Sequence, residues 1–370
     1  MYLFKYYRPD FLFDKAIRYN ELYFSAPAQL NDPNDLNIVY RFDNGLNFWT
    51  LLLNSQCEYS HKDLSQILDL NKLNIQQGLN RIFRSKRIKS NLEALDELFD
   101  DHRAEIQEIL YDNMNHINII DPKIYGAEPN PRQFLVTLCE QSIKERLYKK
   151  IVPAICSVSF SSKALNSMMW AHYTAGFSGC VVIYKAKQSI HDKLPYMELK
   201  DNLLSMSSFK FDIKPIKYSN QTKEVSLLDP RSDTAELFCI KNRFWNYESE
   251  YRMSIAEKNI GIANERSTKK HVNRNLGHIF HHETSAIQGI IFGPRMSSLK
   301  KEEIWQVIKS NMEIRESELC YFFDAELSLS GKIKISSGQQ AKKNQGKMLS
   351  KNKISEANLP NILKELGITN

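Results

Sequence analysis

Two carboxylates and a guanidinium alternate along one short stretch in the second half of the chain. Read as a strand from about Glu248 onward, the stretch places Glu248, Glu250 and Arg252 on one face, because successive side chains of a strand point to opposite sides. Trp245 and Tyr247 precede these residues and would lie at the entrance of that face. Carboxylates held in this way can stabilise a developing positive charge or position a nucleophile. A solvated strand face whose charges pair in water is the alternative.

Segment 25–35 reads as a constrained loop, because it contains two prolines and several Asn and Asp residues. Asn31, Asp32 and Asp35 are its candidate functional side chains. Short polar side chains that cap their own backbone would explain this composition. The functional alternative is a loop that closes one wall of a ligand cleft.

Two further predicted strands carry side chains that could complete a site. The aromatic segment 2–7 contains Lys5, and Arg8 follows it directly. Segment 156–161 alternates between apolar and hydroxyl side chains, which is the pattern of a strand with two different faces. Its hydroxyl face consists of Ser157, Ser159 and Ser161.

A helix is predicted from about 165 to 173, between segment 156–161 and a buried strand at 180–184. Trp170, His172 and Tyr173 lie on this helix. Packing in the core accounts for most of the Trp170 side chain. His172 fits equally well as a core histidine with a satisfied ring and as a contact to a ligand.

The organisation of the chain follows from its periodicity and charge. The 370 residues predict about two domains. Strand patterns in 1–44 and 151–330 indicate one discontinuous α+β core, and helical spacing of Leu and Ile in 45–150 indicates a large helical insertion. Segment 331–353 contains seven lysines and no acidic residue, which equals the whole net charge of +7 and predicts a basic flexible tail. Segment 354–370 predicts a short terminal helix.

Several chemistries are excluded by missing motifs. The chain has no phosphate-binding loop, no strand–GxGxxG–helix and no GxSxG elbow. Its six cysteines form no CxxC pair and no leader precedes the first strand, so we expect reduced thiols in a cytoplasmic protein. No apolar run is long enough to span a bilayer, so no membrane is expected. The tight run His278, His281, His282 and Glu283 reads as a polar turn between strands, and no metal is expected.

Four blocks of the sequence resemble, in order, the bacterial domain-of-unknown-function family numbered 2971. They are 24–35, then 158–161 with 169–173 (Met-Trp-Ala-His-Tyr) and Gly179, then 245–252 (Trp-Asn-Tyr-Glu-Ser-Glu-Tyr-Arg), and 291–293 (Ile-Phe-Gly). The helical region 45–150 and the lysine-rich tail lie outside the resemblance.

The layout also resembles, more distantly, the ADP-ribosyltransferase superfamily. The resemblance implies a basic residue on the first strand, here Lys5 or Arg8, and a middle Ser-x-Ser strand that contains Ser159. It also implies a late Glu-x-Glu pair, for which Glu248 and Glu250 are the candidate catalytic residues. The mixed β core would then be of ADP-ribosyltransferase-like type, with NAD as a substrate and no metal.

The proposed chemistry assigns a role to each remaining candidate. Arg8, Arg252 or Lys5 would hold the pyrophosphate of NAD. Aromatic rings would stack on nicotinamide or adenine, the candidates being Tyr173, Trp170 and Tyr247. The resemblance implies an effector of the antiphage-defence or toxin type that modifies nucleic acid or protein.

Two other classes of function stay open. One is a metal-assisted nuclease or hydrolase that uses His172, the histidine run at 278–283 and the carboxylates. The other is a non-catalytic module that binds nucleic acid or a partner through a basic helix near 81–89 and the lysine tail. A regulatory partner would bind the helical insertion or the tail.

Overall fold

The computed structural model describes residues 1–36, 38–43, 45–55, 64–70, 73–115, 131–151, 155–190, 193–221, 223–227, 234–256, 277–314, 319–342 and 349–369. The chain forms two compact units. Unit 1 consists of Met1–Asp35, Ile155–Asn220 and Cys239–Asn370, and unit 2 of Leu36–Ala154 and Gln221–Phe238. The predicted α+β class is confirmed, because helices accompany a large mixed sheet.

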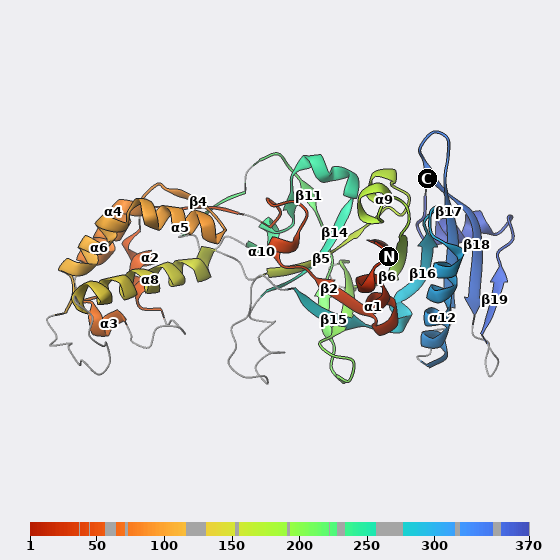
Figure 1. Ribbon diagram of the computed structural model, residues 1–370, viewed down its shortest axis with the longest axis horizontal. Helices are drawn as coiled ribbons and strands as arrows, with labels where there is room; N and C mark the ends of the chain where they lie inside the picture. The colour runs from red at the N-terminus through yellow and green to blue at the C-terminus, as the bar shows by residue number, and fades with distance from the viewer. Residues whose placement is uncertain are drawn as a thin grey trace. The chain divides into compact units, whose positions relative to one another are not determined.

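A nine-stranded sheet forms the centre of unit 1 (Figure 1). Its strand order is β10 (Lys214–Pro215), β14 (Glu250–Ala256), β5 (Ile155–Ser161), β1 (Tyr2–Tyr7), β6 (Cys180–Lys185), β16 (Ile287–Phe292), β17 (Leu319–Leu327), β18 (Ile333–Lys342) and β19 (Ser350–Lys353). Within this sheet, β16 and β17 are the one described pair that is parallel. The helix α12 (Ser298–Ile314) connects these two strands in the sequence. Strand β6 is buried on both faces, as expected for a central strand.

Both faces of this sheet are covered. One face packs against α1 (Phe11–Tyr19), α12 and a second sheet, in which β2 (Glu21–Phe24) pairs with β15 (His278–His282) and β15 with β8 (Pro195–Lys200). Strands β7 (Lys187–Gln188) and β9 (Phe209–Asp212) flank β8. The other face packs against α9 (Ser167–Tyr173) and α13 (Leu359–Glu365). A parallel pair, β11 (Lys217–Tyr218) with β13 (Ile240–Lys241), lies outside the two larger sheets.

The main sheet opens between β1 and β5. Strand β1 pairs with β6 along its whole length, and β5 pairs with β14 along its whole length, but β1 and β5 pair only at Phe4 and Ser161. Further along β5, Ser157 exchanges two backbone hydrogen bonds of 2.7 and 2.9 Å with Ser25, which follows β2. Lys5 donates from its side chain to the Ser159 carbonyl at 3.1 Å, so a side chain replaces part of the absent ladder. The two strands therefore diverge and leave room for a ligand.

The helix α1 lies next to this opening, and a local cap fixes where it begins. The Asp10 carboxylate accepts hydrogen bonds from the Leu12 and Phe13 amides at 3.0 and 3.1 Å, as an N-cap residue does. Phe13, Ala16 and Ile17 form its buried stripe. The sequence predicts this short helix from Asp10 as its cap and from the apolar stripe that follows, and the structure confirms it.

Unit 2 contains helices and a small sheet. The helices are α2 (Leu46–Leu53), α3 (Leu64–Ile67), α4 (Asn74–Phe83), α5 (Leu92–Asp101), α6 (Arg103–Asp112), α8 (Pro131–Ile151) and α10 (Thr234–Leu237). The sheet has the order β12 (Glu224–Ser226), β3 (Val39–Arg41), β4 (Arg87–Lys89). The unit is thus wider than the predicted insertion 45–150 and includes a second segment of the chain.

Two sequence predictions about charged segments are wrong. The basic run near 81–89 is not one helix, because α4 ends at Phe83, Ser85 has a positive φ of 64°, and Arg87 begins a strand. The segment 331–353 is not a flexible tail where the structure describes it, because it forms β18 and β19. Ile333 and Ala341 are buried there, so a few apolar side chains fix strands whose other residues are basic or polar. The sequence also predicts a basic loop at 264–271, which lies outside the described residues.

Candidate functional site

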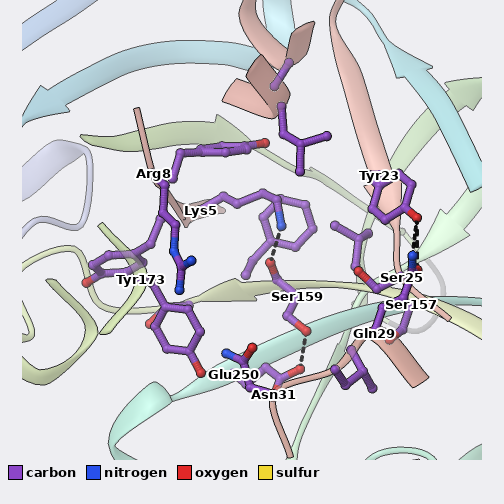
Figure 2. Close-up of a pocket in the computed structure, with 18 of the residues that line it drawn as sticks. Lys5, Arg8, Tyr23, Ser25, Gln29, Asn31, Ser157, Ser159, Tyr173 and Glu250 are labelled. Atoms are coloured by element: carbon purple, nitrogen blue, oxygen red, sulfur yellow. Dashed lines mark hydrogen bonds between the residues drawn. The ribbon is translucent and has the colours of Figure 1, made fainter. Parts of the chain in front are cut away.

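A cavity of about 810 Å³ lies at the opening between β1 and β5 (Figure 2). This volume lies within the range of roughly 300–1,000 Å³ that is typical of small-molecule and cofactor sites. Consecutive residues of both strands line it, from Phe4 to Arg8 and from Ser157 to Ser161. Other lining residues come from α1, β2, the loop after β2, α9 and the region before β14, and include Lys15, Tyr23, Ser25, Gln29, Asn31, Asp32, Asp35, Met169, Tyr173, Lys241, Glu248 and Glu250.

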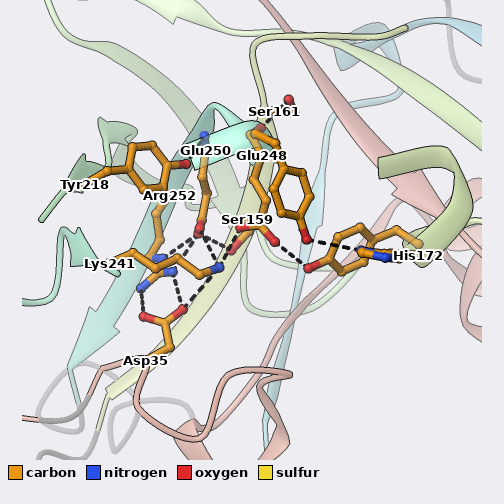
Figure 3. A network of polar contacts seen from close by, with 11 residues as sticks. Asp35, Ser159, Ser161, His172, Tyr218, Lys241, Glu248, Glu250 and Arg252 are labelled. Atoms are coloured by element: carbon orange, nitrogen blue, oxygen red, sulfur yellow. Dashed lines mark hydrogen bonds and ion pairs between the residues drawn. The ribbon is translucent and has the colours of Figure 1, made fainter. Parts of the chain in front are cut away.

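One wall of the cavity belongs to a buried cluster of five charged side chains (Figure 3), of which all except Arg252 line the cavity. The Lys241 ammonium lies 2.6 Å from a Glu248 oxygen, 3.1 Å from a Glu250 oxygen and 3.5 Å from an Asp35 oxygen. The Arg252 guanidinium contacts Asp35 and Glu250, each at 2.7 Å. All five are less than a tenth exposed. With every group charged, three carboxylates and two cations leave the cluster with one net negative charge.

Hydroxyl groups orient the two glutamates. The Ser159 hydroxyl donates to Glu250 Oε1 at 2.5 Å, and the Tyr173 hydroxyl donates to Glu248 Oε1. The Glu250 amide donates to the Tyr218 hydroxyl at 2.8 Å. Both carboxylates are therefore held by donors from several elements and have little freedom to rotate.

Burial and charge act in opposite directions on the ionisation of this cluster. Burial raises the pKa of the Glu248 carboxyl, against the attraction of Lys241 and the hydrogen bond from Tyr173. Burial alone would lower the pKa of Lys241, but the carboxylates of Glu250, Glu248 and Asp35 outweigh it and raise that pKa. Lys241 is thus a permanent cation, and Glu248 is a carboxyl that holds a proton more readily than usual.

The local backbone explains how Glu248 reaches the cluster. Glu248 ends the 3₁₀ helix η2 (Arg243–Glu248), and Ser249 has a positive φ of 47° before β14 begins at Glu250. The prediction that Glu248 lies on the strand is therefore wrong, although both carboxylates still contact Lys241. The prediction that Glu250 and Arg252 share a strand face is confirmed by their direct contact.

The opposite wall carries two cations from the first strand and its end. Lys5 points its amine into the cavity, where the rings of Tyr7 and Phe160 lie 5.5 and 5.6 Å from the nitrogen. Burial lowers the pKa of Lys5 to about 8, although Glu250 acts to raise it. Arg8 is exposed and reaches into the same space (Figure 2), and it has no ion pair with any residue in the described ranges. Lys5, Arg8, Glu248 and Glu250 thus all line one cavity.

Two predicted ligand contacts are wrong because the side chains are fully engaged elsewhere. Trp170 has no exposed surface, donates to the Ala164 carbonyl at 2.8 Å and packs against Tyr6, so it cannot stack on a ligand. Arg252 is 2% exposed and is bound by Asp35 and Glu250, so it positions carboxylates and cannot hold a pyrophosphate.

Three other predicted residues lie beside the cavity and do not line it. Trp245 is half-buried with the Lys241 nitrogen 5.1 Å from the centre of its ring. Tyr247 contacts the Nδ1 atom of the exposed His172 through its hydroxyl at 3.1 Å. The prediction that Trp245 and Tyr247 form the entrance is therefore wrong, and His172 is neither a core histidine nor part of the cavity wall.

The loop after β2 does close one wall of the cavity. Asn31 lies at this wall and hydrogen-bonds the Tyr173 side chain. The Asp32 carboxylate accepts from the Asn34 amide at 2.9 Å, so it shapes the turn that delivers Asp35 to the charged cluster. The loop thus both caps its own backbone and closes one wall of the cavity.

Lys241 is a site residue that no sequence pattern predicts. It lies on the two-residue strand β13, whereas the sequence predicts a helix over 229–244, and that prediction is wrong at β13. Ser157 was expected only as a member of the hydroxyl face. Ser157 lines the cavity, and its buried Oγ has no hydrogen-bond partner within the described part of the chain.

The histidine run at 278–282 does not converge. His281 contacts the Tyr19 carbonyl at 2.9 Å, and His282 is buried and contacts the Glu283 carbonyl at 2.7 Å. The described residues contain no group of three or more His, Cys, Asp or Glu side chains placed to bind one metal ion. None of the described helices combines the length and the apolar character needed to cross a bilayer.

The fold and the site define an α+β protein whose main sheet opens onto a cavity between an acidic cluster and two cations. Comparison of the chain with models of known families finds no match, and comparisons with curated proteins and with solved structures find no similar protein.

Proposed function

We propose that the cavity binds NAD and that the protein is an ADP-ribosyltransferase-like enzyme. The observation that carries the proposal is the convergence of Lys5, Arg8, Ser159 and Glu250 on one cavity. These residues come from β1, β5 and β14, which are neighbours in the sheet. The resemblance to the superfamily assigns a basic residue, a serine and a glutamate to the corresponding three strands.

Glu250 supports cleavage of the bond between nicotinamide and ribose. Breaking this bond places positive charge on the ribose ring, and a fixed carboxylate next to the ring stabilises that charge. Ser159, Lys241 and Arg252 hold Glu250 in one orientation, so no reorganisation is needed during the reaction. The net negative charge of the cluster acts in the same direction.

Glu248 supports transfer to an acceptor. Its carboxyl lies beside that of Glu250, on the same lysine, and burial raises its pKa. A carboxylate with a raised pKa is a stronger base, so Glu248 can take the proton from an acceptor hydroxyl as the new bond forms. Tyr173 fixes the Glu248 oxygen through its hydroxyl.

Arg8 and Lys15 provide the binding site for the pyrophosphate. Both line the cavity, both are exposed, and neither has an ion pair among the described residues. Arg8 can bind a phosphate through two parallel hydrogen bonds. The acceptor in this proposal is a nucleic acid or a protein, and the biological role is that of an antiphage or toxin effector, as the resemblance implies.

The test measures nicotinamide release and ADP-ribose transfer from labelled NAD, with cell extract as a source of acceptors. We expect Glu250→Gln to lower kcat by roughly 100-fold or more, because removal of one fixed group that stabilises transition-state charge has this effect. Glu198→Gln is the matched control, since Glu198 pairs with Lys187 on the surface at 2.7 Å and lies outside the cavity. Absence of release and of transfer in the wild type, or full activity in Glu250→Gln, would contradict the proposal.

A further inference from the structure

Two lysines line the cavity in opposite electrostatic environments. Lys241 contacts three carboxylates and is held as a cation. Lys5 makes one hydrogen bond, to the backbone carbonyl of Ser159, and has no carboxylate within ion-pair distance among the described residues. The cavity therefore contains one lysine that only carries charge, Lys241, and one whose nitrogen can act as a nucleophile, Lys5.

The surroundings of Lys5 favour its neutral amine. Burial lowers the pKa of Lys5 to about 8 from an ordinary value of 10.5. This lowering outweighs Glu250 and the rings of Tyr7 and Phe160, whose centres lie 5.5 and 5.6 Å from the nitrogen and which favour its charged form. At pH 7 this lowering gives roughly 300-fold more free amine than an ordinary lysine has. An amine that is desolvated in this way reacts readily with carbonyl carbon atoms.

We propose that Lys5 is a second reactive centre of the cavity, where its amine forms an imine with the aldehyde of ring-opened ADP-ribose. The choice of this aldehyde rests on the proposed function, because hydrolysis of NAD in the cavity would release ADP-ribose beside Lys5. Its phosphates would be held by Arg8, which reaches into the same space (Figure 2). NAD itself cannot react in this way, because nicotinamide occupies the anomeric carbon of its ribose.

The step is a condensation that releases one water molecule. The Lys5 nitrogen attacks the aldehyde carbon with its electron pair, a C–N bond forms, and the carbonyl oxygen becomes a hydroxyl by taking a proton from the nitrogen. The hydroxyl then leaves as water with a second proton, and the nitrogen electron pair completes the C=N bond. No electrons are gained or lost overall. The imine keeps the product in the cavity, so it inhibits further turnover until water reverses it.

The test uses ADP-ribose itself, followed by sodium borohydride, whose hydride reduces an imine to a stable secondary amine. Peptide mapping by mass spectrometry then locates the adduct in the wild-type protein. We expect Lys5 to be labelled at least roughly tenfold more than Lys15, an exposed lysine of the same cavity. Lys5→Arg should lose this adduct, and Lys15→Arg should keep it. An analogue with a methyl group on the anomeric oxygen, which cannot open its ring, should give no adduct.

Equal labelling of Lys5 and Lys15, or no adduct on Lys5, would overturn the inference. The result is independent of NAD cleavage, because ADP-ribose is supplied directly. A protein that is labelled at Lys5 but releases no nicotinamide from NAD refutes only the proposed function. A protein that releases nicotinamide but is not labelled at Lys5 refutes only the imine.

Discussion

Replacing Lys241 by methionine tests whether the charged cluster is the structural centre of the site. Methionine keeps most of the side-chain volume but leaves Asp35, Glu248 and Glu250 with Arg252 as their only cation in the cluster. Removing one partner of a buried ion pair costs about 3–5 kcal/mol. Since a domain is stable by only about 5–15 kcal/mol, the variant should lose a large share of the stability of unit 1.

The loss should depend on pH in a defined direction. The folded-state pKa of Glu248 is already raised above 4.5 by burial, and removal of Lys241 raises it further. A carboxyl with a raised folded pKa destabilises the folded state above that pKa, and the penalty disappears as pH falls to its unfolded value. The stability difference between Lys241→Met and wild type should therefore shrink as the pH is lowered toward 4.5.

Urea unfolding monitored by tryptophan fluorescence measures this difference. Trp49 is the tryptophan of unit 2, so a Trp49→Phe background leaves reporters only in unit 1. Lys187→Met is the matched control, because Lys187 and Glu198 form an exposed pair that should contribute less than about 1 kcal/mol. A loss below about 1 kcal/mol for Lys241→Met, or a difference that does not change with pH, would refute the role of the cluster.

Three other predictions follow from the same structure. Lys5 has a folded pKa of about 8, below its ordinary value of 10.5, so protonated Lys5 destabilises the folded state. The stability of the wild type should therefore rise as the pH increases from about 8 to 10.5. Lys5→Met should be more stable than the wild type at neutral pH by up to about 3 kcal/mol, which denaturation at several pH values measures. Arg8→Gln should raise the KM for NAD by roughly tenfold or more and leave thermal unfolding unchanged, because Arg8 is exposed at the cavity. Truncation after Gly331 should lower the thermal stability of unit 1 strongly, because it removes β18, which pairs with β17, and the apolar residues of β18 and α13 that pack in one cluster with Phe323; an unchanged melting temperature would contradict this packing.

The elements that the sequence predicts well depend on local signals. Strand β1, helix α1 with its Asp10 cap and strand β5 all follow from alternation, helical spacing or capping within a few residues. These elements include the strands that carry Lys5 and Ser159, and Glu250 was found because it alternates with Arg252. Much of the candidate site could therefore be read from the sequence.

The parts that the sequence did not predict depend on partners far along the chain. Lys241 becomes a site residue only because β13 pairs with β11 and brings it to Glu248 and Glu250. The lysine-rich segment 331–353 has a composition typical of flexible tails, but β17 supplies a paired edge for β18 and a core into which Ile333 packs. Sequence composition cannot report such an edge.

Burial caused the remaining errors. Trp170 and Arg252 have side chains that suit a ligand site, and the sequence does not show that neighbours cover both completely. The reverse holds for Glu248, whose position depends on the left-handed conformation of Ser249 and not on strand alternation. A non-glycine residue in that conformation has no reliable sequence signal.

A crystal structure of the protein with a carbon-linked NAD analogue, whose nicotinamide cannot be released, tests the central claim most directly. The account predicts density in the cavity between β1 and β5, with the nicotinamide ribose at Glu250 and the pyrophosphate at Arg8. Crystals grown with saturating analogue that leave this cavity empty, or that hold the analogue at another place on unit 1, would contradict it.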